Sequence, residues 1–397
     1  MEKINFHFFA LAALGSGLSG SDRIFIEFAR RWSRSLKINI YLWTEGYEMC
    51  QRQGLKSKNI LFKTSSMRPW NSWGFIVNYF ARIFEGIRLG FVVRLRNNKN
   101  TLIYSASDFW MDVLPCFILK LRFSKVRWMA TWYQTAPNPI KGYSEGQRVE
   151  KYRFKAFLYW LSQLFVKPLI SNFANFVLVN NESEKRHFPS LNKDKKVLVV
   201  LGAVDTVKIH KWILKNKKTT KIYDAVFQGR FHPQKGSIEL VEIWRIVVDQ
   251  KSDAKLVMIG DGPLMEEVKL KIKSLRLENN IKLLGYVFDG DRKYSIFSQS
   301  KIVLHPAFYD SGGMASAEAM AFGLPCIGFN LKSYLSYYPK GMVKIKIGDL
   351  NAFSKTILKF LFNDEYREKV GKEASEMIKK NWSWDTRAKD ILNSVKN

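Results

Sequence analysis

Two cationic side chains and a pair of glycines in the second half of the sequence have the spacing of an anion-binding site. Arg230 and Lys235 lie within Gly229–Gly236, where a predicted strand gives way to a predicted helix. About 80 residues later, Gly312-Gly313 again separate a strand from a helix. A glycine pair at a helix N-terminus exposes backbone N–H groups and lets an anion approach closely. Arginine offers a fork to phosphate oxygens and lysine a point charge, so the set suits a diphosphate better than one phosphate.

Two carboxylates bracket the glycine pair. Asp310 precedes the glycines, and Glu318 lies eight residues after Asp310, in the predicted helix. A carboxylate at that place would repel phosphate, so Glu318 suits the hydroxyl groups of a ribose. The alternative is a plain strand–helix connection in which the acid only stabilises the first turns of the helix.

The elements that must position these residues alternate between strand and helix. Strands are predicted at Asp224–Gln228, Lys255–Ile259, Ile281–Tyr286, Ile302–His305 and Pro325–Phe329. Helices are predicted near Ser237–Val248, Pro263–Leu275, Arg292–Gln299 and Gly313–Ala321, with further helices at Asn351–Phe362, Asp364–Lys380 and Trp384–Ser394. Open α/β folds bind ligands at the carboxyl edge of the parallel sheet, and both loops are expected there.

The first half of the chain has the same alternation. Strands are predicted at Lys3–Phe9, Ile38–Trp43, Asn59–Lys63, Thr101–Ser105, Val126–Tyr133, Phe176–Asn180 and Val197–Leu201. Helices are predicted at Asp22–Ser33, Phe75–Leu95, Met111–Arg122 and Val149–Phe165. The 397-residue length favours two domains, and the polar run Lys215–Lys221 marks a boundary. We therefore predict two doubly wound α/β domains, each a parallel sheet with helices on both faces, facing each other across a cleft.

The cysteine content and the N-terminal segment indicate the cellular compartment in which the protein works. Three cysteines lie far apart without a Cys-x-x-Cys pair, which argues against a disulfide framework or a zinc site and fits a reducing cytosol. Lys3 and the apolar run Ile4–Leu14 have some features of a signal peptide. Glu2 and His7 fit that interpretation poorly, and a first strand, glycine loop and helix explains the whole region.

The formal net charge is +29 and is unevenly distributed. From Gln51 to Asn100 there are ten Lys or Arg residues against one acid, Glu85. Such a balance implies an anionic partner, either nucleic acid or a membrane surface, unless the protein is simply a basic soluble enzyme. There is no helix-turn-helix, zinc or RNP signature, so no nucleic-acid partner is expected.

One predicted helix, Phe75–Leu95, is amphipathic. At 100° per residue, polar side chains share one arc: Asn78, Arg82, Glu85, Arg88 and Arg96. The opposite side carries apolar ones: Phe80, Ile83, Phe84, Ile87 and Phe91. With Arg68, Trp70 and Trp73 upstream, the segment predicts an interfacial helix on anionic lipid. The alternative is a helix that covers the sheet and keeps its charges in water.

Four motifs in order, GRFHPQKG, LVMIGDGP, LLGYV and LHPAFYDSGGMASAEAMAFGLPCIGFN, resemble the donor-binding half of family-four glycosyltransferases with the GT-B fold. The order and spacing match from about Asp224 to Asn330. SGLSGSDRIFIEFA resembles that family's first glycine loop, LGAVD its interdomain motif, and Trp382–Val395 the helix that crosses back to the first domain. The resemblance implies two Rossmann-like domains, 1–205 for the acceptor and 206–380 for the nucleotide-sugar, with 381–397 as the returning helix.

Carried over by residue, the resemblance implies the following roles. Arg230 and Lys235 hold the donor diphosphate and stabilise the leaving group, and Asp310 faces the transferred sugar or its phosphate. Glu318 binds the ribose hydroxyls, and Val287 lies where the backbone contacts the base. Backbone N–H groups for the diphosphate come from Gly312, Gly313 and Met314, with Gly20 and Ser21 closing over it from the first domain.

The chain departs from the family pattern at two positions. The first acid of the E-x7-E motif is Asp310 rather than Glu, which shortens its reach by one methylene. Many members carry a His near the reacting sugar, whereas the matching segment 130–137 has none. The candidates for its place are Gln134, which can hydrogen-bond the sugar but cannot act as a base, and Tyr133. Asp108 and Asp112, at a predicted strand end, are further candidates. The alternative for Asp108 is a helix N-cap.

The sequence thus predicts a retaining, metal-independent glycosyltransferase with no cofactor, whose donor is a nucleotide-sugar. The acceptor is predicted to be a lipid-linked or cell-envelope glycan, and the enzyme to be cytoplasmic and peripheral at the inner face of the membrane. A GT-B-like sugar-nucleotide epimerase is the first alternative and a basic nucleic-acid-binding protein the second. The base, the sugar and the acceptor linkage stay open.

Overall fold

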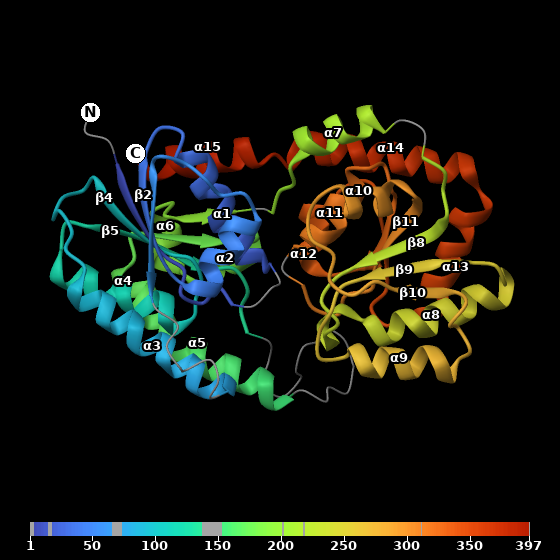
Figure 1. The fold of residues 1–397 in the computed structure, drawn as a ribbon, viewed down its shortest axis with the longest axis horizontal. Coiled ribbons are helices and arrows are strands. Elements are labelled where there is room, and N and C mark those ends of the chain that lie inside the picture. Colours follow the sequence, from blue (N-terminus) through green and yellow to red (C-terminus); the bar gives the residue numbers. More distant parts are fainter. Residues whose placement is uncertain are drawn as a thin grey trace. The chain divides into compact units, whose positions relative to one another are not determined.

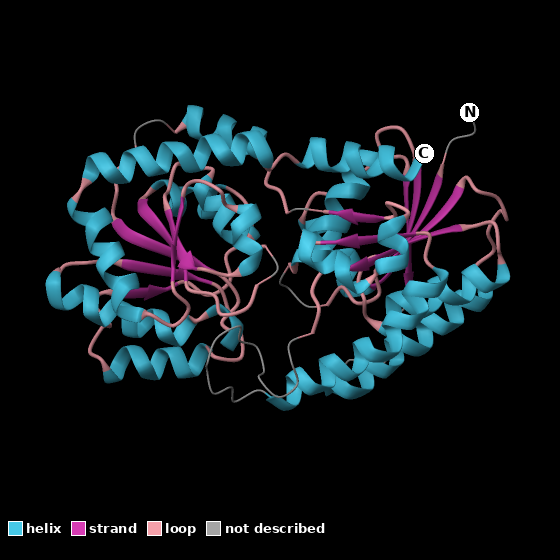
Figure 2. Ribbon diagram, turned by 180° about the vertical axis from the view of Figure 1, so that it is seen from behind, coloured by secondary structure: helices cyan, strands magenta, loops and turns pink. Residues whose placement is uncertain are grey.

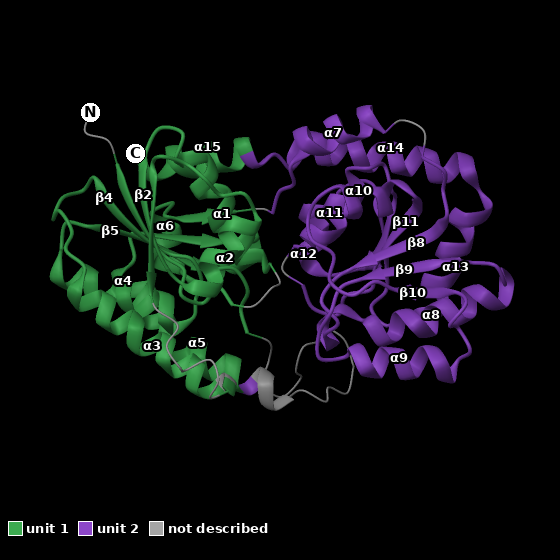
Figure 3. Ribbon diagram, in the orientation of Figure 1, with its two compact units in different colours: residues 1–136, 158–200, 385–397 green, residues 137–157, 201–384 purple. Residues whose placement is uncertain are grey.

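Two compact units make up the chain, each with its own sheet. The structure is a computed structural model and describes residues 4–14, 18–65, 74–136, 153–200, 202–216, 219–310 and 312–396. Unit 1 holds residues 1–136, 158–200 and 385–397, and unit 2 holds 137–157 and 201–384 (Figures 1 and 3). The domain limits at 205 and 380 stay a prediction.

Unit 1 is built on a seven-stranded sheet in the order β3-β2-β1-β4-β5-β6-β7. The strands are β1 (Asn5–Phe9), β2 (Lys37–Trp43), β3 (Ile60–Ser65), β4 (Thr101–Ser105), β5 (Arg127–Trp132), β6 (Phe176–Val179) and β7 (Val197–Val199). All neighbouring pairs are parallel. The order places β3 at one edge and β1 in the interior.

Helices cover both faces of this sheet, as the view from behind also shows (Figure 2). They are α1 (Gly20–Trp32), α2 (Thr44–Arg52), α3 (Gly74–Val92), α4 (Trp110–Arg122), α5 (Arg153–Phe173), η2 (Glu182–His187), α6 (Pro189–Lys193) and α15 (Trp384–Lys396). Side chains alternate along β1, so Phe6 and Phe8 pack on Trp32 of α1, with ring centroids 4.8 and 5.9 Å away. Phe9 points to the other face, where it stacks on Tyr41 at 4.6 Å in the core beneath α3 and α4.

Unit 2 is built on a six-stranded parallel sheet in the order β10-β9-β8-β11-β12-β13. Its strands are β8 (Tyr223–Gln228), β9 (Leu256–Ile259), β10 (Ile281–Leu283), β11 (Ser300–His305), β12 (Cys326–Phe329) and β13 (Met342–Ile345). One apolar core lies between the sheet and α8 (Ser237–Gln250), α9 (Met265–Ser274) and α13 (Leu350–Phe362). The other lies under α7 (Thr206–Lys215), α10 (Asp291–Ser298), α11 (Met314–Met320), α12 (Lys332–Tyr337) and α14 (Asp364–Asn381).

The predicted fold class is confirmed: both units are α/β with parallel sheets and helices on both faces. The sequence reading missed several short elements, namely α2, α6, α7, α12, η2 and β13. α7 ends at Lys215, so the predicted polar boundary begins where this helix stops. Each of these elements is at most ten residues long, so its apolar pattern repeats too few times to be recognised in the sequence.

Within the described residues, no helix has the length and apolarity needed to cross a bilayer.

α3 fits only in part the alternative in which the helix covers the sheet and keeps its charges in water. Arg82 is 2% exposed, whereas Phe84 on the opposite arc is 68% exposed. Arg82 donates to the carbonyls of Leu11 and Ala13 at 2.6 and 3.0 Å and to Glu45 at 2.7 Å. Part of the polar arc therefore faces the protein and part of the apolar arc faces outward. Arg68, Trp70 and Trp73 lie outside the described residues.

Candidate active site

The two loops predicted to bind an anion pack against each other at the carboxyl edge of the unit 2 sheet. β8 and β11 are neighbours, and η3 (Pro233–Lys235) follows β8. The carbonyl of Gln234 accepts from the amide of Phe308 at 2.8 Å, which joins the two loops. Gly236 has φ +65°, and a Cβ there would lie 2.0 Å from the carbonyl oxygen of Pro306. Glycine is therefore required at position 236 for both backbone conformation and space.

Asp310 lies at the centre of this loop pair. Its Oδ2 accepts from Lys235 Nζ at 2.5 Å and lies 2.9 Å from His305 Nε2. Its Oδ1 accepts from the amides of Gly312 and Gly313, each at 3.1 Å. The lysine and both glycine amides that the sequence assigned to a diphosphate thus converge on one carboxylate.

The charge of Asp310 is held by these partners. Burial by itself would raise the pKa of this carboxyl, but the Lys235 ammonium and the hydrogen bond from His305 hold the pKa well below its usual range. The carboxylate is therefore ionised in the folded protein at neutral pH. Lys235 and the two amides therefore already hold one anionic group, the Asp310 carboxylate itself.

Tyrosines from α12 and the residue after it line the back of the glycine loop. Tyr338 Oη donates to the carbonyls of Gly312 and Gly313, at 3.0 and 2.7 Å. Gly313 has φ +62°, and a Cβ there would lie 3.3 Å from both the Tyr334 and Tyr338 hydroxyl oxygens. The glycine pair is thus fixed by a wall that the sequence did not reveal. Ser311, between Asp310 and the pair, lies outside the described residues.

Arg230 is the exposed member of the site. It follows β8 by two residues, and among the residues that the structure describes it makes no ion pair. The loop beside it fits tightly, since a Cβ at Gly260 would lie 1.9 Å from the carbonyl oxygen of Gly229. The amide of Phe231 donates to the carbonyl of Asp261 at 3.0 Å. The backbone of Arg230 is therefore fixed while its guanidinium stays available to solvent.

Neither histidine near the site behaves as a solvent-facing base. His305 is 2% exposed and holds Asp310. His232 Nδ1 accepts from the amide of Gln234 at 3.4 Å and so shapes the turn.

Glu318 lies on α11, where it forms an ion pair that the sequence reading missed. Its Oε2 accepts from Lys293 Nζ of α10 at 2.5 Å, and Lys293 also pairs with Asp289. The Lys293 side chain is only 2% exposed. No local motif marks Lys293, because its partner lies 25 residues away on another helix.

Two further predicted binding residues have different surroundings. Met314 is the first residue of α11, where backbone N–H groups have no partner within the helix. The Val287 side chain is buried in the core, so only its backbone is left for a ligand. Tyr286 and Phe288 on either side of it are partly exposed, with their rings edge to face at 4.9 Å.

In unit 1, Asp108 and Gln134 follow the neighbouring strands β4 and β5 and share partners on α5. Gln163 Nε2 donates to Asp108 Oδ2 at 2.5 Å and to the carbonyl of Gln134 at 2.8 Å. Tyr159 Oη also donates to both, at 3.3 and 3.1 Å. Burial raises the pKa of Asp108, and the bonds from Gln163 and Tyr159 oppose that rise. The N-cap alternative for Asp108 is wrong, because Phe109 occupies the N-cap of α4.

A second carboxylate lies near this pair. Glu184 in η2 accepts a hydrogen bond from the Thr135 hydroxyl, and burial raises its pKa. The sequence reading missed Glu184, Gln163 and Tyr159, because none belongs to a motif. Together these side chains form a polar cluster at the ends of β4 and β5.

Gly20 and Ser21 open α1. Ser19 is the N-cap and forms a capping box with Asp22, so the helix starts two residues before the predicted Asp22. The Ser21 hydroxyl lies 2.9 Å from that of Ser19. Gly20 is exposed and belongs to the first turn, where free amides face outward.

Known proteins are similar to this chain in both sequence and fold. Residues 208–377 match the family model described as "Glycosyl transferases group 1". An uncharacterized glycosyltransferase of Methanocaldococcus jannaschii is 24% identical over 70% of this chain and 65% of its own length. The UDP-Gal:alpha-D-GlcNAc-diphosphoundecaprenol alpha-1,3-galactosyltransferase of Escherichia coli is 27% identical over 43% of this chain and 39% of its own. This chain therefore spans less than two thirds of either relative.

The fold is similar to that of solved glycosyltransferases. Anabaena Alr3699/HepE, in complex with UDP and glucose, has a TM-score of 0.70 with 14% identity and covers 99% of both chains. Homologues also include enzymes of capsular polysaccharide biosynthesis. Residues 208–377 therefore form a glycosyl transferases group 1 domain, in a chain with the two-sheet α/β fold of GT-B glycosyltransferases.

Proposed function

We propose that this protein transfers a sugar, with retention of anomeric configuration, from a nucleotide-sugar to a lipid-linked or cell-envelope glycan. The observation that carries the proposal is the convergence of Lys235 and the amides of Gly312 and Gly313 on one anionic group. Arg230 follows β8, is exposed, and makes no ion pair with any residue that the structure describes. The similarity of residues 208–377 to group 1 glycosyltransferases supports the same conclusion.

The proposed chemistry is stabilisation of a leaving group. Breaking a sugar–phosphate bond leaves a nucleoside diphosphate with added negative charge. Preorganised cations and amides stabilise such charge without reorganising during the reaction. We propose that Arg230 and Lys235 bind the diphosphate, that Glu318 binds the ribose and that the reaction needs no metal ion.

Asp310 has to change partners in this scheme. Its carboxylate holds Lys235 and both glycine amides in the structure. A diphosphate reaching the same groups would displace it, leaving Asp310 to face the transferred sugar. The polar cluster of Asp108, Gln134 and Glu184 is proposed to hydrogen-bond the sugar and the acceptor hydroxyl.

The acceptor is proposed from the surface of unit 1. α3 and α5 expose large apolar side chains: Ile76, Phe80, Phe84, Phe91, Val92, Phe157, Leu158, Leu164 and Phe165. Apolar patches of this kind mark contacts with a protein, a membrane or a ligand. With a net charge of +29, contact with an anionic membrane that presents the acceptor is the proposal that fits both features.

The test is nucleoside-diphosphate binding by Arg230→Ala. Titration calorimetry with UDP, GDP and ADP on the parent protein identifies the base. Arg230→Ala should weaken that binding by roughly 1.5–3 kcal/mol, the range for hydrogen bonds to charged groups. The melting temperature should not change, because Arg230 is exposed.

Arg276→Ala is the matched control, since Arg276 is another cation of unit 2, in the turn after α9, and should not affect binding. Equal affinity of the Arg230→Ala variant and the parent protein would reject the donor site. Sugar transfer to an acceptor at a rate that EDTA does not change supports a metal-independent transferase. Conversion of the nucleotide-sugar to its epimer in the absence of any acceptor would show that the protein is an epimerase instead.

A further inference from the structure

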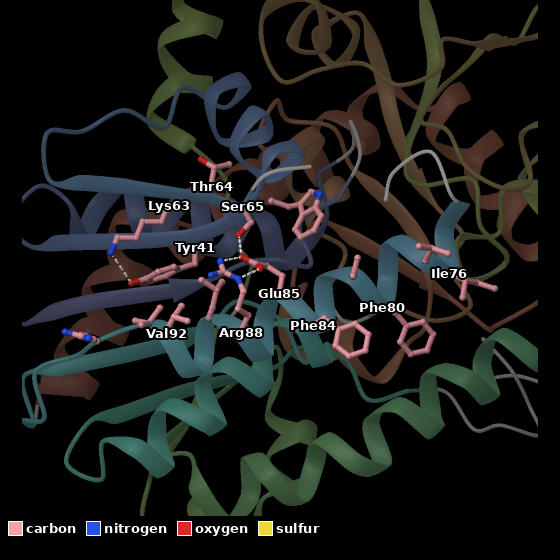
Figure 4. Close-up of a pocket in the computed structure, with 16 residues that line it drawn as sticks. Tyr41, Lys63, Thr64, Ser65, Ile76, Phe80, Phe84, Glu85, Arg88 and Val92 are labelled. Carbon is pink, nitrogen blue, oxygen red and sulfur yellow. Dashed lines mark hydrogen bonds and ion pairs between the residues drawn. The ribbon is translucent and has the colours of Figure 1, made fainter. Parts of the chain in front are cut away.

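A groove runs along α3 in unit 1, away from the residues discussed so far. It has a volume of about 1130 Å³ and lies between α3 and strands β2 and β3, of which β3 is the edge strand (Figure 4). Its polar lining includes Lys63, Ser65, Glu85, Arg88 and Arg94. Its apolar lining includes Tyr41, Trp43, Ile76, Phe80, Phe84 and Val92.

The α3 wall of the groove is a regular stripe. Ile76, Phe80, Phe84, Arg88 and Val92 recur every four residues and line the groove. Successive residues at this spacing are about 40° apart around the helix axis, so the row winds round α3 as it advances along the groove. Sixteen residues of helix separate the two ends, so the stripe is about 24 Å long. The groove is thus long enough for an extended hydrocarbon chain.

The exposed rings of the stripe are not needed to cover the sheet. Phe80 and Phe84 are 52% and 68% exposed, while the buried side of α3 packs through residues such as Ile83 and Leu89. Leaving a large apolar side chain in water forgoes roughly 1.5–3 kcal/mol relative to burying it. An apolar chain laid along the stripe would recover part of that free energy.

Positive charge gathers at one end of the groove. Figure 4 shows Lys63 beside Tyr41 and near Val92, with Phe80 and Ile76 at the opposite end. Lys63 Nζ lies 3.5 Å from Tyr41 Oη, and Arg94 follows Val92 by two residues. Among the described residues, neither Lys63 nor Arg94 pairs with a carboxylate. The ligand that matches the groove has an anionic head at this end and an apolar tail toward Ile76.

The two charged side chains in the middle of the groove, Glu85 and Arg88, neutralise each other. Glu85 accepts from Arg88 Nε and Nη2, both at 2.7 Å, and from the Ser65 hydroxyl. The buried Trp43 ring also lines the groove, and its Nε1 has no acceptor among the described residues.

We infer that this groove binds the phosphate and the hydrocarbon chain of a lipid-linked acceptor, with the phosphate at Lys63 and Arg94 and the chain along the α3 stripe. The inference rests on the proposed function, which supplies the acceptor. The proposed function gives unit 1 only a general surface for contact with a membrane. The inference adds a specific site for one hydrocarbon chain. The charge pattern favours this occupant over a second copy of the chain, since each copy would bring the same uncompensated cations.

The experiment measures equilibrium binding of farnesyl phosphate below its critical micelle concentration. Phe84→Asp should weaken binding more than tenfold. Phe91→Asp is the matched control, because Phe91 is on the same helix and 61% exposed but does not line the groove. It should bind as the parent protein does. Lys63→Ala should weaken farnesyl phosphate binding at least threefold without changing the weaker binding of farnesol.

Further measurements separate the possible occupants. If Phe84→Asp and Phe91→Asp weakened farnesyl phosphate binding equally, the ligand would be binding to the apolar surface in general and not to the groove. That result would overturn the inference. Farnesol binding as tightly as farnesyl phosphate would remove the head-group site. Displacement by dihexanoyl phosphatidylglycerol at equal concentration would indicate membrane lipid instead of acceptor. Dimerisation lost in Phe84→Asp would indicate a second copy.

Binding of UDP, GDP and ADP is measured on each variant, because the proposed diphosphate ligands Arg230 and Lys235 lie in unit 2 and the groove lies in unit 1. If a nucleoside diphosphate still binds but farnesyl phosphate does not, only the groove is overturned. If the parent protein binds none of the three nucleoside diphosphates, the proposed function is overturned instead.

Discussion

At the scale of single residues, the main finding is that Asp310 occupies the proposed anion site of its own domain. Lys235, His305 and the amides of Gly312 and Gly313 surround its carboxylate. A glutamate would extend one methylene further from the loop. The shorter aspartate reaches the amides two and three residues ahead of it, a hydrogen-bonding pattern that short polar side chains adopt readily. An aspartate at position 310 therefore lets the side chain bond back to the amides of its own glycine loop.

Asp310→Asn tests whether the carboxylate competes with phosphate. Removing its charge leaves Lys235 for the ligand, so nucleoside-diphosphate affinity should rise at least fivefold, on the order of 1 kcal/mol for a nearby charge. The melting temperature should fall at neutral pH. The pKa of Asp310 is lower in the folded state than in the unfolded state, so its ion pair stabilises the protein at pH values above the pKa of the unfolded state. This stabilisation is lost as the pH falls and the carboxylate takes up a proton. The two proteins should therefore converge in stability in acid. Unchanged affinity would contradict displacement of Asp310 by the donor.

Asp112 predicts a pH dependence of the opposite sign. Burial raises its pKa to about 7, while the Ser107 hydroxyl and the amide of Ala12 donate to it at 2.6 and 3.1 Å. The folded state binds the carboxyl proton of Asp112 more tightly than the unfolded state does. The protonated side chain therefore contributes fully to the free energy of unfolding below about pH 4, and this contribution declines as the pH rises to 7. Asp112→Asn keeps both contacts without the charge. The stability of the parent protein relative to this variant should fall by up to about 4 kcal/mol across that range. Urea denaturation from pH 4 to 8 measures it, and parallel curves would contradict the prediction.

At the scale of elements, α3 joins the outer groove to the loop after β1. Arg82 on its inner side donates to the carbonyls of Leu11 and Ala13, and Asp112 of α4 accepts from the amide between them. That loop leads to the start of α1, where Gly20 and Ser21 lie. α3 is therefore both a wall of the proposed acceptor groove and a support for the first glycine loop.

Arg82→Met should destabilise unit 1 by roughly 3–5 kcal/mol, because it leaves Glu45 and two loop carbonyls without their buried partner. Arg88→Met is the control on the same helix, with an exposed ion pair that should change stability by less than about 1 kcal/mol. Chemical denaturation compares the two. Equal small effects would mean that Arg82 does not support the loop.

At the scale of the whole molecule, charge and exposed apolar side chains favour the same kind of partner. The net charge is +29, and large apolar residues of α3 and α5 are open to solvent. The partner that we propose from both features is an anionic lipid surface. Electrostatic attraction and shallow burial of apolar side chains act together in such contacts.

Vesicle sedimentation tests this at two salt concentrations. Binding to vesicles rich in phosphatidylglycerol should be strong at 50 mM salt and at least tenfold weaker at 500 mM, where the screening length is much shorter. Neutral phosphatidylcholine vesicles are the control and should bind weakly at both. No binding at low salt would contradict membrane association.

The sequence by itself determined the two α/β units, because strand and helix periodicity is local and repeats along both halves. It also determined the two loops at the carboxyl edge of the unit 2 sheet, because Gly236 and the Gly312-Gly313 pair need conformations or space that few other residues allow. Only the tertiary structure decided that Asp310 fills the anion site, that Lys293 pairs with Glu318, and that Arg82 faces inward while Phe84 faces outward. A helical pattern identifies two sides but not which side meets the sheet, and ion pairs between distant elements leave no mark in local sequence.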